Sequence, residues 1–396
     1  MPNPIRTDGS NRFARDSIAV RYPSIIDETI HGGSDLPSAA VRELARLRDE
    51  LTTGAPLRLF EPPAPDYDVW VQRFARYARD AWLDTEWFFG DHLFYRRILQ
   101  AVRWWETGTD PYAMAKEAEY LSPRLAELMR EVGGFSQSDP SDRLSVLLLH
   151  SLWGNRVDLS NRETARLGIG DPSERDSRLL LDDREAVIRR LGDTRGEVSI
   201  VTDNAGTELA MDLVLADALI ALQHTAVYLH VKMHPTYVSD ATSEDVRAMI
   251  ALFRSGSTGR ESVGLGDRLR GALREGRLRL APDLYWNLPY WLAELPPRIA
   301  QLFERSVLVI LKGDANYRRL VRDTDWPPGA PLAEAVSLWR PTAELSRLPP
   351  ILALRSLKSD PLAGISPERA DRLDRSDPQW RTNGRYGIAQ LHRSGA

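Results

Sequence analysis

The stretch Val198-Ser-Ile-Val-Thr-Asp-Asn-Ala-Gly-Thr-Glu208 joins a short apolar run to a helical pattern through two oxygen-bearing side chains. The run predicts a β-strand that breaks at Asp203 and Asn204, and Gly206 predicts the turn into a helix. In an open α/β sheet, ligands bind at the carboxyl ends of the strands, and the N-terminus of the following helix favours an anion. The stretch therefore predicts a place where a hard cation and a phosphate lie side by side.

Two later segments have the same form. The run Ala-Val-Tyr-Leu-His-Val-Lys, which begins at Ala226, is followed by Asp240, and the run Ser-Val-Leu-Val-Ile-Leu-Lys-Gly, which begins at Ser306, ends at Asp314. A single Asp after a strand is usually a helix N-cap or a turn residue. The recurrence in one half of the chain favours a shared carboxylate site.

Strand-like runs alternate with helical patterns through this half of the chain. Strands are expected at 198–202, 226–231, 278–282, 307–311 and 351–354. Helical patterns, such as 209–223 and 244–253, separate them. This alternation predicts an α/β fold in which helices cover both faces of a mostly parallel sheet, a three-layer αβα, Rossmann-like arrangement.

The first third of the chain has a different pattern. Residues 67–132 are helical in pattern and rich in aromatic residues, whose spacing favours packed helix faces over a base-stacking or cofactor surface. We therefore expect an N-terminal arm and helical subdomain over 1–135 and an α/β catalytic domain over 136–380. The remaining residues, 381–396, are expected to form a C-terminal tail, and the arginine-dotted sequence after Asp377 is expected to lie on the surface.

The composition is that of a soluble globular protein, with 42% hydrophobic and 27% charged residues in 396. The absence of cysteine excludes disulfides, thiolate metal sites and a cysteine nucleophile. A formal net charge of −4 gives no electrostatic reason to expect nucleic acid as the main partner. No apolar run approaches the roughly 18 residues of a membrane helix, and the polar start lacks a signal-peptide core. We therefore expect no membrane partner and a cytoplasmic location.

Two other motifs do not support a site. His230 and His234 have the spacing of a helical zinc pair, but on an extended strand they would lie about 13 Å apart. The pair Gly264-x-Gly266 lacks the third glycine of a dinucleotide-binding loop and does not follow a strand. A nicotinamide site is therefore unsupported, and the chain also lacks the glycine-rich loop that binds nucleoside triphosphates.

Several ordered motifs resemble the signature of the damage-control phosphatase family. They are Asp203-Asn204-x-Gly206-x-Glu208, Val238-Ser239-Asp240, Lys312-Gly313-Asp314-x-Asn316-Tyr317-Arg318-Arg319-Leu320 and Arg355-Ser356-Leu357-Lys358. Supporting segments are Leu152-Trp153-Gly154-Asn155-x-x-Asp158-Leu159-Ser160, Glu86 and Tyr95-Arg96-Arg97-Ile98. The resemblance covers roughly residues 60 to 360. It is closest to the third subfamily, which includes sugar phosphate phosphatases and proteins also described as acidic-residue methyltransferases.

The expected metal ligands are Asp203, Asn204 and Asp240. Two carboxylates and an amide oxygen suit Mg²⁺ or Mn²⁺, with waters completing the coordination shell. The resemblance implies that these three positions bind a divalent metal, Mn²⁺, Mg²⁺, Co²⁺ or Ni²⁺. The alternative is that Asp203 caps the next helix while Asn204 forms an Asx turn.

The expected substrate contacts come from three segments. The resemblance implies that Glu208 contacts the substrate, although the helix dipole alone favours a carboxylate in the first turn of a helix. The second segment is Asp314, Ala315, Asn316, Tyr317 and Arg318. Apart from the alanine, these residues supply a carboxylate acceptor, an amide, a phenol and a guanidinium. Its guanidinium can bind phosphate oxygens as a fork, and its carboxylate and amide can hold hydroxyls. Lys358 would balance phosphate charge.

Four further residues are matched with less detail. Arg319 is expected to face away from the site and to pair on the surface. Lys232 also corresponds to a lysine of the family pattern. Asn155 and Asp158 either support the site or cap a helix.

Two classes of function remain open. The first is a metal-dependent phosphomonoesterase with Asp203, Asp240, Arg318 and Lys358 in catalysis. It would act on small phosphorylated metabolites, and the resemblance implies sugar phosphates such as fructose 1-phosphate or fructose 6-phosphate. The attacking group is either water or the carboxylate of Asp203.

The second class is an S-adenosylmethionine-dependent carboxyl methyltransferase acting on protein glutamates. The single glycine in Asp203-Asn204-Ala205-Gly206 counts against it, because such enzymes usually carry a glycine-rich cofactor loop. A catalytically inactive scaffold is a third alternative, which the intact acidic and basic motifs disfavour.

Overall fold

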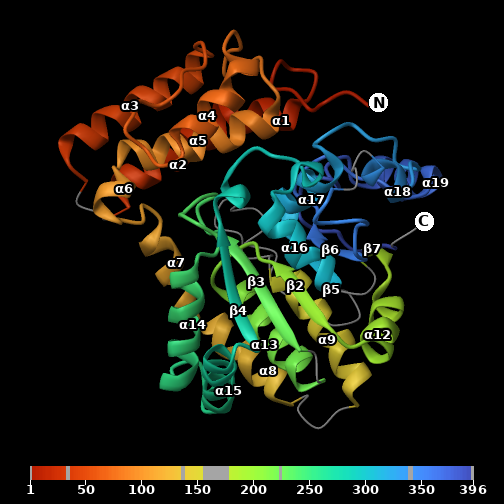
Figure 1. Ribbon diagram of the computed structural model, residues 1–396. Helices are drawn as coiled ribbons and strands as arrows, with labels where there is room; N and C mark the ends of the chain where they lie inside the picture. Colours follow the sequence, from red (N-terminus) through yellow and green to blue (C-terminus); the bar gives the residue numbers. More distant parts are fainter. Residues whose placement is uncertain are drawn as a thin grey trace. The chain divides into compact units, whose positions relative to one another are not determined.

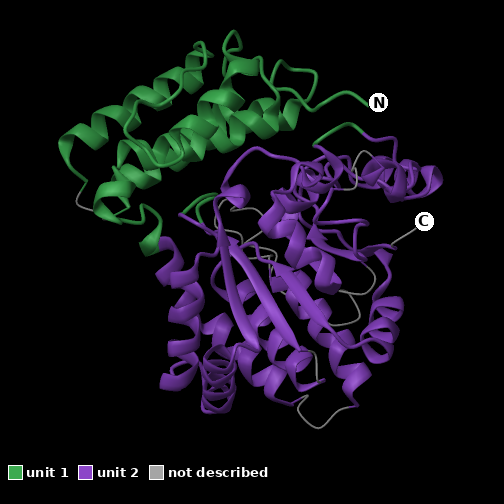
Figure 2. Ribbon diagram, in the orientation of Figure 1, with its two compact units in different colours: residues 1–114, 235–238, 323–325 green, residues 115–234, 239–322, 326–396 purple. Residues whose placement is uncertain are grey.

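The computed structural model describes residues 2–32, 36–134, 139–154, 178–222, 225–337 and 342–393. They form two compact units, coloured separately in Figure 2. Unit 1 contains residues 1–114 with the short segments 235–238 and 323–325, and unit 2 contains the rest. The expected domain limits at 135 and 380 stay predictions. No helix within the described ranges is long and apolar enough to cross a membrane.

Unit 1 is helical. Its elements are α1 (Arg12–Asp16), a π-helical turn (Ser17–Arg21), α2 (Tyr22–His31), α3 (Ser38–Thr53), α4 (Tyr67–Phe74), a 3₁₀ turn (Ala75–Tyr77), α5 (Trp87–Ala101) and α6 (Trp104–Thr107). Helix α5 is buried along almost its whole length. Tyr77 stacks on Phe89 with ring centroids 3.8 Å apart, and Tyr22 stacks on Phe94 at 4.2 Å. The aromatic residues therefore form the core of this unit, as their spacing predicts.

Unit 2 is built on a seven-stranded sheet in the order β1-β7-β6-β5-β2-β3-β4. The strands are β1 (Leu179–Asp182), β2 (Glu197–Val201), β3 (Ala226–Lys232), β4 (Leu278–Asp283), β5 (Ser306–Lys312), β6 (Ile351–Ser356) and β7 (Gly387–His392). Strands β2 to β6 are mutually parallel, whereas β7 is antiparallel to β6 and parallel to β1. The carboxyl ends of β2, β3, β5 and β6 consequently share one edge of the sheet.

Helices cover both faces of this sheet (Figure 1). One face packs on α8 (Pro123–Gly134), α9 (Pro140–Trp153), α12 (Arg184–Asp193), α13 (Thr207–Ala221), α14 (Ser243–Ser255) and α15 (Glu261–Glu275). The other packs on α16 (Pro297–Arg305), α17 (Gly313–Val321), α18 (Leu332–Val336), α19 (Pro367–Ser376) and two 3₁₀ turns (Leu284–Asn287 and Leu292–Glu294). Helix α7 (Ala113–Tyr120) precedes α8.

The period of two residues along each strand explains the two cores. Ile200 and Ile310 belong to one hydrophobic cluster, whereas the neighbouring Val201 and Val309 belong to the cluster on the opposite face. Both faces are apolar because a parallel sheet is covered on both sides. The three-layer αβα arrangement is thus confirmed.

The expected strands are confirmed to within two residues at each end, and two strands were missed. Gly387–His392 was expected to belong to a surface tail, and this expectation is wrong. Ile388 and Ala389 are buried, and β7 lies between β1 and β6. A strand at this position needs apolar residues on both faces, and the short segment Gly-Ile-Ala-Gln-Leu-His supplies only a few.

Candidate active site

Backbone hydrogen bonds join the end of β2 to the segment that follows β3. The Ala205 amide donates to the Ser239 carbonyl at 2.6 Å, and the Ala241 amide donates to the Asp203 carbonyl at 2.8 Å. Asn204 and Asp240 form an isolated antiparallel bridge between these hydrogen bonds. The structure therefore brings the three expected metal ligands together from two neighbouring strand ends.

The side-chain amide of Asn204 is held in one orientation. Its Nδ2 donates to Asp203 Oδ2 at 3.0 Å and to Glu208 Oε2 at 2.9 Å, while Ser239 Oγ donates to its Oδ1 at 2.5 Å. Only the amino group can donate to two carboxylates, so the oxygen must face the serine. A carbonyl oxygen has two lone pairs, and one remains for a cation.

The carboxylates of this site are buried close to one another. Burial raises the pKa of Asp203 well above its usual value, and the nearby Glu208 and Asp240 carboxylates raise it further. Lys232 and Lys358 offset part of this effect, and Lys232 Nζ lies 3.1 Å from Asp240 Oδ2. A divalent cation would favour the ionised form of both aspartates.

The donor set therefore fits a hard divalent metal: Asp203 and Asp240 carboxylates with the Asn204 amide oxygen. Across the ranges described above, no group of three or more His, Cys, Asp or Glu side chains is arranged to hold a metal. The expected ligand set therefore contains two carboxylates and the Asn204 amide oxygen.

Gly313, at the junction of β5 and α17, lies against the Asp203 carboxylate. Its φ is +80°, and a Cβ atom added there would lie 1.9 Å from Asp203 Oδ2. Only glycine combines this backbone conformation with so close an approach. Sequence analysis did not assign this role to Gly313, because the contact joins two segments far apart in the chain.

Lys312 forms a buried ionic cluster with Glu208 and Asp212. Its Nζ donates to Glu208 Oε1 at 2.6 Å and to the Ser151 carbonyl at 2.8 Å, and it lies 2.9 Å from Asp212 Oδ1. Ser151 Oγ also donates to Asp212 Oδ1 at 2.6 Å. Burial lowers the pKa of Lys312, but the two carboxylates raise it more, so its pKa lies above the usual range.

This cluster changes the expected role of Glu208. One of its oxygens accepts from Lys312 and the other from Asn204, and the side chain is buried. Burial raises its pKa, and Lys312 offsets this in part. Glu208 thus links the lysine to the amide of Asn204, an expected metal ligand. The sequence around Glu208 does not indicate that Lys312, Asp212 and Ser151 belong to this cluster.

Asp314, in the first turn of α17, is tied to the loop after β6. Arg355 Nε donates to Asp314 Oδ1 at 2.8 Å, and the Lys358 backbone amide donates to the same oxygen at 3.2 Å. Burial raises the pKa of Asp314, but the charges of Arg355 and Arg318 lower it more, so the net pKa lies below the usual value. Asp314 is therefore an anion that positions the backbone of Lys358.

Asn316 and Tyr317, the next polar residues of α17, have different surroundings. Asn316 Nδ2 donates to the carbonyls of Lys312 at 2.9 Å and Thr202 at 3.2 Å, so it joins α17 to two strand ends. Its Oδ1 has no hydrogen-bond partner among the residues that the structure describes. Tyr317, in contrast, lies in the core, where its hydroxyl donates to Gln390 at 3.2 Å. Ala315, which precedes Asn316, is buried.

The expectation that Arg319 pairs on the surface is wrong. Its guanidinium is buried, donates to the carbonyls of Leu288 at 2.9 Å and Trp286 at 3.2 Å, and also donates to the Tyr290 carbonyl. It lies 5.0 Å from the centre of the Tyr285 ring. Arg319 therefore holds the segment 285–290 in place.

The two histidines and the pair Asn155 and Asp158 were also considered in the sequence. His230 bonds to Ser199 Oγ at 3.1 Å, and His234 bonds to Asn287, so the two histidines have separate partners. Burial lowers the pKa of His230 to about 4. Asn155 and Asp158 lie outside the described residues.

Comparison with known proteins identifies the family. Residues 18–373 match the family model described as the damage-control phosphatase ARMT1-like domain. Proteins named damage-control phosphatase ARMT1 are similar over nearly their whole length. The mouse protein is 29% identical over 96% of both chains, and that of Xenopus tropicalis is 28% identical over 98% of both. The zebrafish protein (Danio rerio) is 27% identical over 98% of this chain and 97% of its own.

These matches define the class as a phosphatase, a hydrolase that acts on phosphorylated small molecules. The chain belongs to the damage-control phosphatase ARMT1-like family, which confirms the resemblance seen in the sequence. The family depends in general on a divalent metal and acts on damaged metabolites. Among solved structures, a DUF89 family protein from Pyrococcus horikoshii covers 91% of this chain and 99% of its own, with 13% identity and a TM-score of 0.48.

Proposed function

We propose that this phosphatase hydrolyses small sugar phosphates of the fructose 1-phosphate or fructose 6-phosphate type. The observation that carries the proposal is the junction of Asp203, Asn204 and Asp240 at the ends of β2 and β3, next to Lys358. Oxygen ligands for a metal and a cation for a phosphate are thus present at one edge of the sheet.

Two helix N-termini reinforce the preference for an anion. Helix α13 follows β2 after the segment 202–206, and α17 begins directly after the end of β5, the neighbouring strand. Unpaired backbone N–H groups and the helix dipole favour a phosphate at such positions. Gly206 and Gly313, with φ of +74° and +80°, make both turns.

In the proposed reaction, the bound metal would polarise the phosphoryl group. Lys358 and Arg318 would neutralise the charge on the phosphoryl oxygens, and the guanidinium can do so as a fork. Asp314 fixes the Lys358 backbone. The attacking group is either a water molecule or the carboxylate of Asp203.

The other members of the site position these groups. Lys232 pairs with Asp240, while Glu208 and Ser239 hold the Asn204 amide. Asn316, with its unpartnered Oδ1 and its place between the strand ends, is the proposed acceptor for a sugar hydroxyl. Tyr317 is excluded from these contacts because it lies in the core.

A comparison of substrates tests the proposal. Fructose 1-phosphate, fructose 6-phosphate and an aryl phosphate would be assayed with wild-type protein and Asn316→Ala. We expect the sugar phosphates to be preferred by wild type, and the substitution to raise KM for them more than for the aryl ester, because only the sugars offer hydroxyls. An equal rise in KM for all three substrates would contradict the assignment of the sugar contact. Among the residues that the structure describes, no observation favours the methyltransferase alternative.

A further inference from the structure

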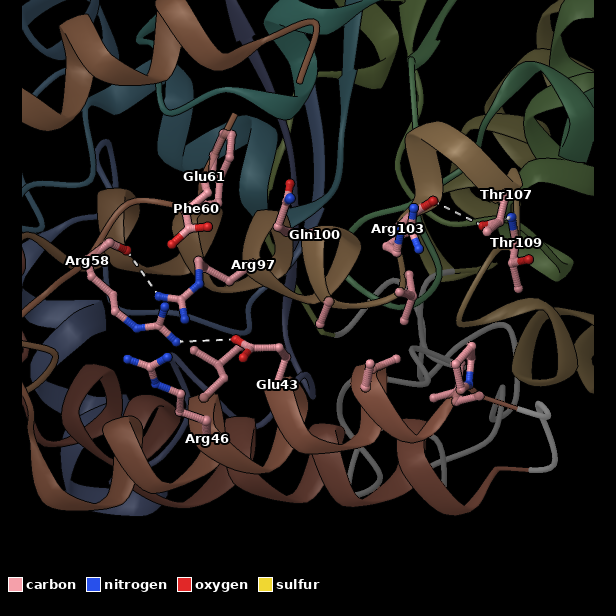
Figure 3. A pocket seen from close by; sticks show the side chains of 17 residues that line it. Glu43, Arg46, Arg58, Phe60, Glu61, Arg97, Gln100, Arg103, Thr107 and Thr109 are labelled. Atoms are coloured by element: carbon pink, nitrogen blue, oxygen red, sulfur yellow. Dashed lines mark hydrogen bonds and ion pairs between the residues drawn. The ribbon is translucent and has the colours of Figure 1, made fainter. Parts of the chain in front are cut away.

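Unit 1 contains a pocket that the proposed function does not use. Its volume is about 480 Å³, which lies within the approximate range of 300 to 1,000 Å³ typical of sites for small organic ligands. The pocket is formed by α3, the segment 58–61 and the end of α5 with the residues that follow it, as Figure 3 shows. Leu47, Phe60 and Val102 contribute apolar surface.

Three guanidinium groups gather at one end of this pocket. Figure 3 shows Arg46, Arg58 and Arg97 close to one another. All three interact with the single carboxylate of Glu50: Arg58 Nε donates to Oε1, Arg97 Nη1 donates to Oε2 at 3.3 Å, and Arg46 Nε lies 3.6 Å from Oε1. Glu50 therefore contacts all three guanidinium groups, while Glu43 lies near Arg58 and Glu61 also lines the pocket.

The second carboxylate near these cations, Glu43, is poorly engaged. Its Oε2 lies 3.6 Å from Arg58 Nη2, which is too long for a hydrogen bond. Arg58 Nη2 has no hydrogen-bond partner within the described part of the chain. The Glu43 side chain is 52% exposed, so it can rotate into solvent at small cost. An entering anion could replace it beside Arg58.

Arg96 and Arg97 are adjacent in the sequence but differ in how well their charges are paired. Arg96 is fully paired, since its guanidinium donates to both oxygens of Asp66 at 2.6 and 2.8 Å and stacks on Phe60. Arg97 is 4% exposed and has only a 3.3 Å bond to Glu50 and a 3.0 Å bond to the Arg58 carbonyl. Burial lowers its pKa to about 10, and the nearby Arg58 contributes to this. The hydrogen bonds of the buried Arg97 therefore offset only part of the cost of burying its charge.

We propose that this pocket binds a small organic phosphate. Its phosphate oxygens would be held by Arg58 and Arg46, with Arg97 behind them, because guanidinium forks match the geometry of phosphate oxygens. The organic part would pack on Phe60 and Leu47. A free inorganic ion would leave most of the 480 Å³ unfilled.

Calorimetry with phenylphosphonate tests this proposal, since the compound resembles an aryl phosphate but has no ester bond to hydrolyse. The titration would use full-length Lys358→Met protein in chelator, so that binding at the proposed catalytic site is weakened. We expect one binding event. Arg58→Met should weaken it about tenfold or more, in line with the loss of a charge-assisted hydrogen bond. Glu43→Gln should strengthen it, because a competing carboxylate is removed.

Matched variants distinguish binding in the pocket from nonspecific electrostatic attraction of the anion to the protein. Arg42, also on α3, is exposed and does not line the pocket, so Arg42→Met should change the affinity less than twofold. Ala39→Trp leaves every charge in place but fills the pocket, and it should abolish binding. If Arg58→Met impairs folding, Arg46→Met provides the same test, because its side chain is 60% exposed.

The outcomes are distinct. Weaker binding by Arg58→Met and stronger binding by Glu43→Gln would support the pocket. Equal binding by Lys358→Met protein with and without Arg58→Met, or an equal loss in Arg42→Met, would overturn it. Benzoate, which carries a carboxylate in place of the phosphonate, is titrated for comparison. Affinity for benzoate equal to that for phenylphosphonate would overturn the assignment to a phosphate. Loss of the phosphatase activity is not required by any of these results, so they are independent of the proposed function.

Discussion

Lys312 Nζ lies 2.6 Å from Glu208 Oε1, and both side chains are excluded from solvent. The lysine is the last residue of β5, and the glutamate lies in the first turn of α13. Through Glu208 Oε2 this pair reaches the amide of Asn204, a proposed metal ligand. The pair therefore connects the buried core of unit 2 to the geometry of the proposed catalytic edge.

Lys312→Met should destabilise the fold strongly, because it leaves Glu208 and Asp212 buried without their cation. Removal of one partner of a buried ion pair costs about 3 to 5 kcal/mol. The double variant Lys312→Met with Glu208→Gln should recover part of that loss. Urea denaturation measures both. A loss below about 1 kcal/mol for the single variant, on the same scale, would show that the cluster is not an important determinant of stability.

Arg318→Ala and Arg319→Ala should have opposite signatures. We expect Arg318→Ala to lower kcat by about 10² or more, with a smaller loss of stability than in Arg319→Ala. Arg319→Ala should instead lower stability by about 3 kcal/mol, because several carbonyls lose a charged donor. Parallel kinetics and denaturation on the two variants check this. A selective loss of kcat in Arg319→Ala would contradict the structural role.

Gly313→Ala should abolish metal binding, because the new methyl group would displace the Asp203 carboxylate. Gly271→Ala, in the middle of α15, is the matched control, since the closest atom to an added Cβ there is 3.9 Å away. It should be neutral or slightly stabilising, as expected for Gly to Ala in a helix. Mn²⁺ titration followed by electron paramagnetic resonance measures the affinity of each variant. Unchanged affinity in Gly313→Ala would contradict the close packing.

The stability of the protein should fall as the pH drops from about 6.5 toward 4, and His230 should contribute to this loss. Burial keeps its folded pKa near 4, whereas its unfolded value is 6.5, so the unfolded state binds the extra proton in this interval. The contribution is roughly 3 kcal/mol when complete. His230→Gln should flatten the pH dependence between these values, and the exposed His31→Gln should not. Equal slopes in wild type and His230→Gln would refute the assignment.

Features of the fold that depend on the local pattern of apolar and polar residues could be predicted from the sequence. Strands β2 to β6 were predictable because their runs are apolar and end at polar residues, and parallel strands bring such ends to one edge. That rule brings β2 and β3 together, whereas Asp203 and Asp240 meet through backbone hydrogen bonds to the segment that follows β3. Strand β7 was missed because its apolar run is short and is preceded by an arginine-rich segment.

Side-chain contacts between segments that are far apart in the chain could not be predicted from the local sequence pattern. Arg319 was placed on the surface because spacing along α17 does not show that the carbonyls of 286–290 surround it. The partners of Glu208 come from β5 and the loop after β2, and nothing in its own segment indicates them. Gly313 fitted a turn in the sequence, but its contact with Asp203 appears only in three dimensions.

The central claim is that Asp203, Asn204 and Asp240 hold the metal required for phosphatase activity. The most direct test is Mn²⁺ titration of metal-free protein, with bound metal and hydrolysis of fructose 1-phosphate measured in the same samples. We expect activity to rise in proportion to the occupancy of one site, and both to be lost in Asp240→Asn. Full activity in excess chelator after verified metal removal, or unchanged metal binding in Asp240→Asn, would contradict the claim.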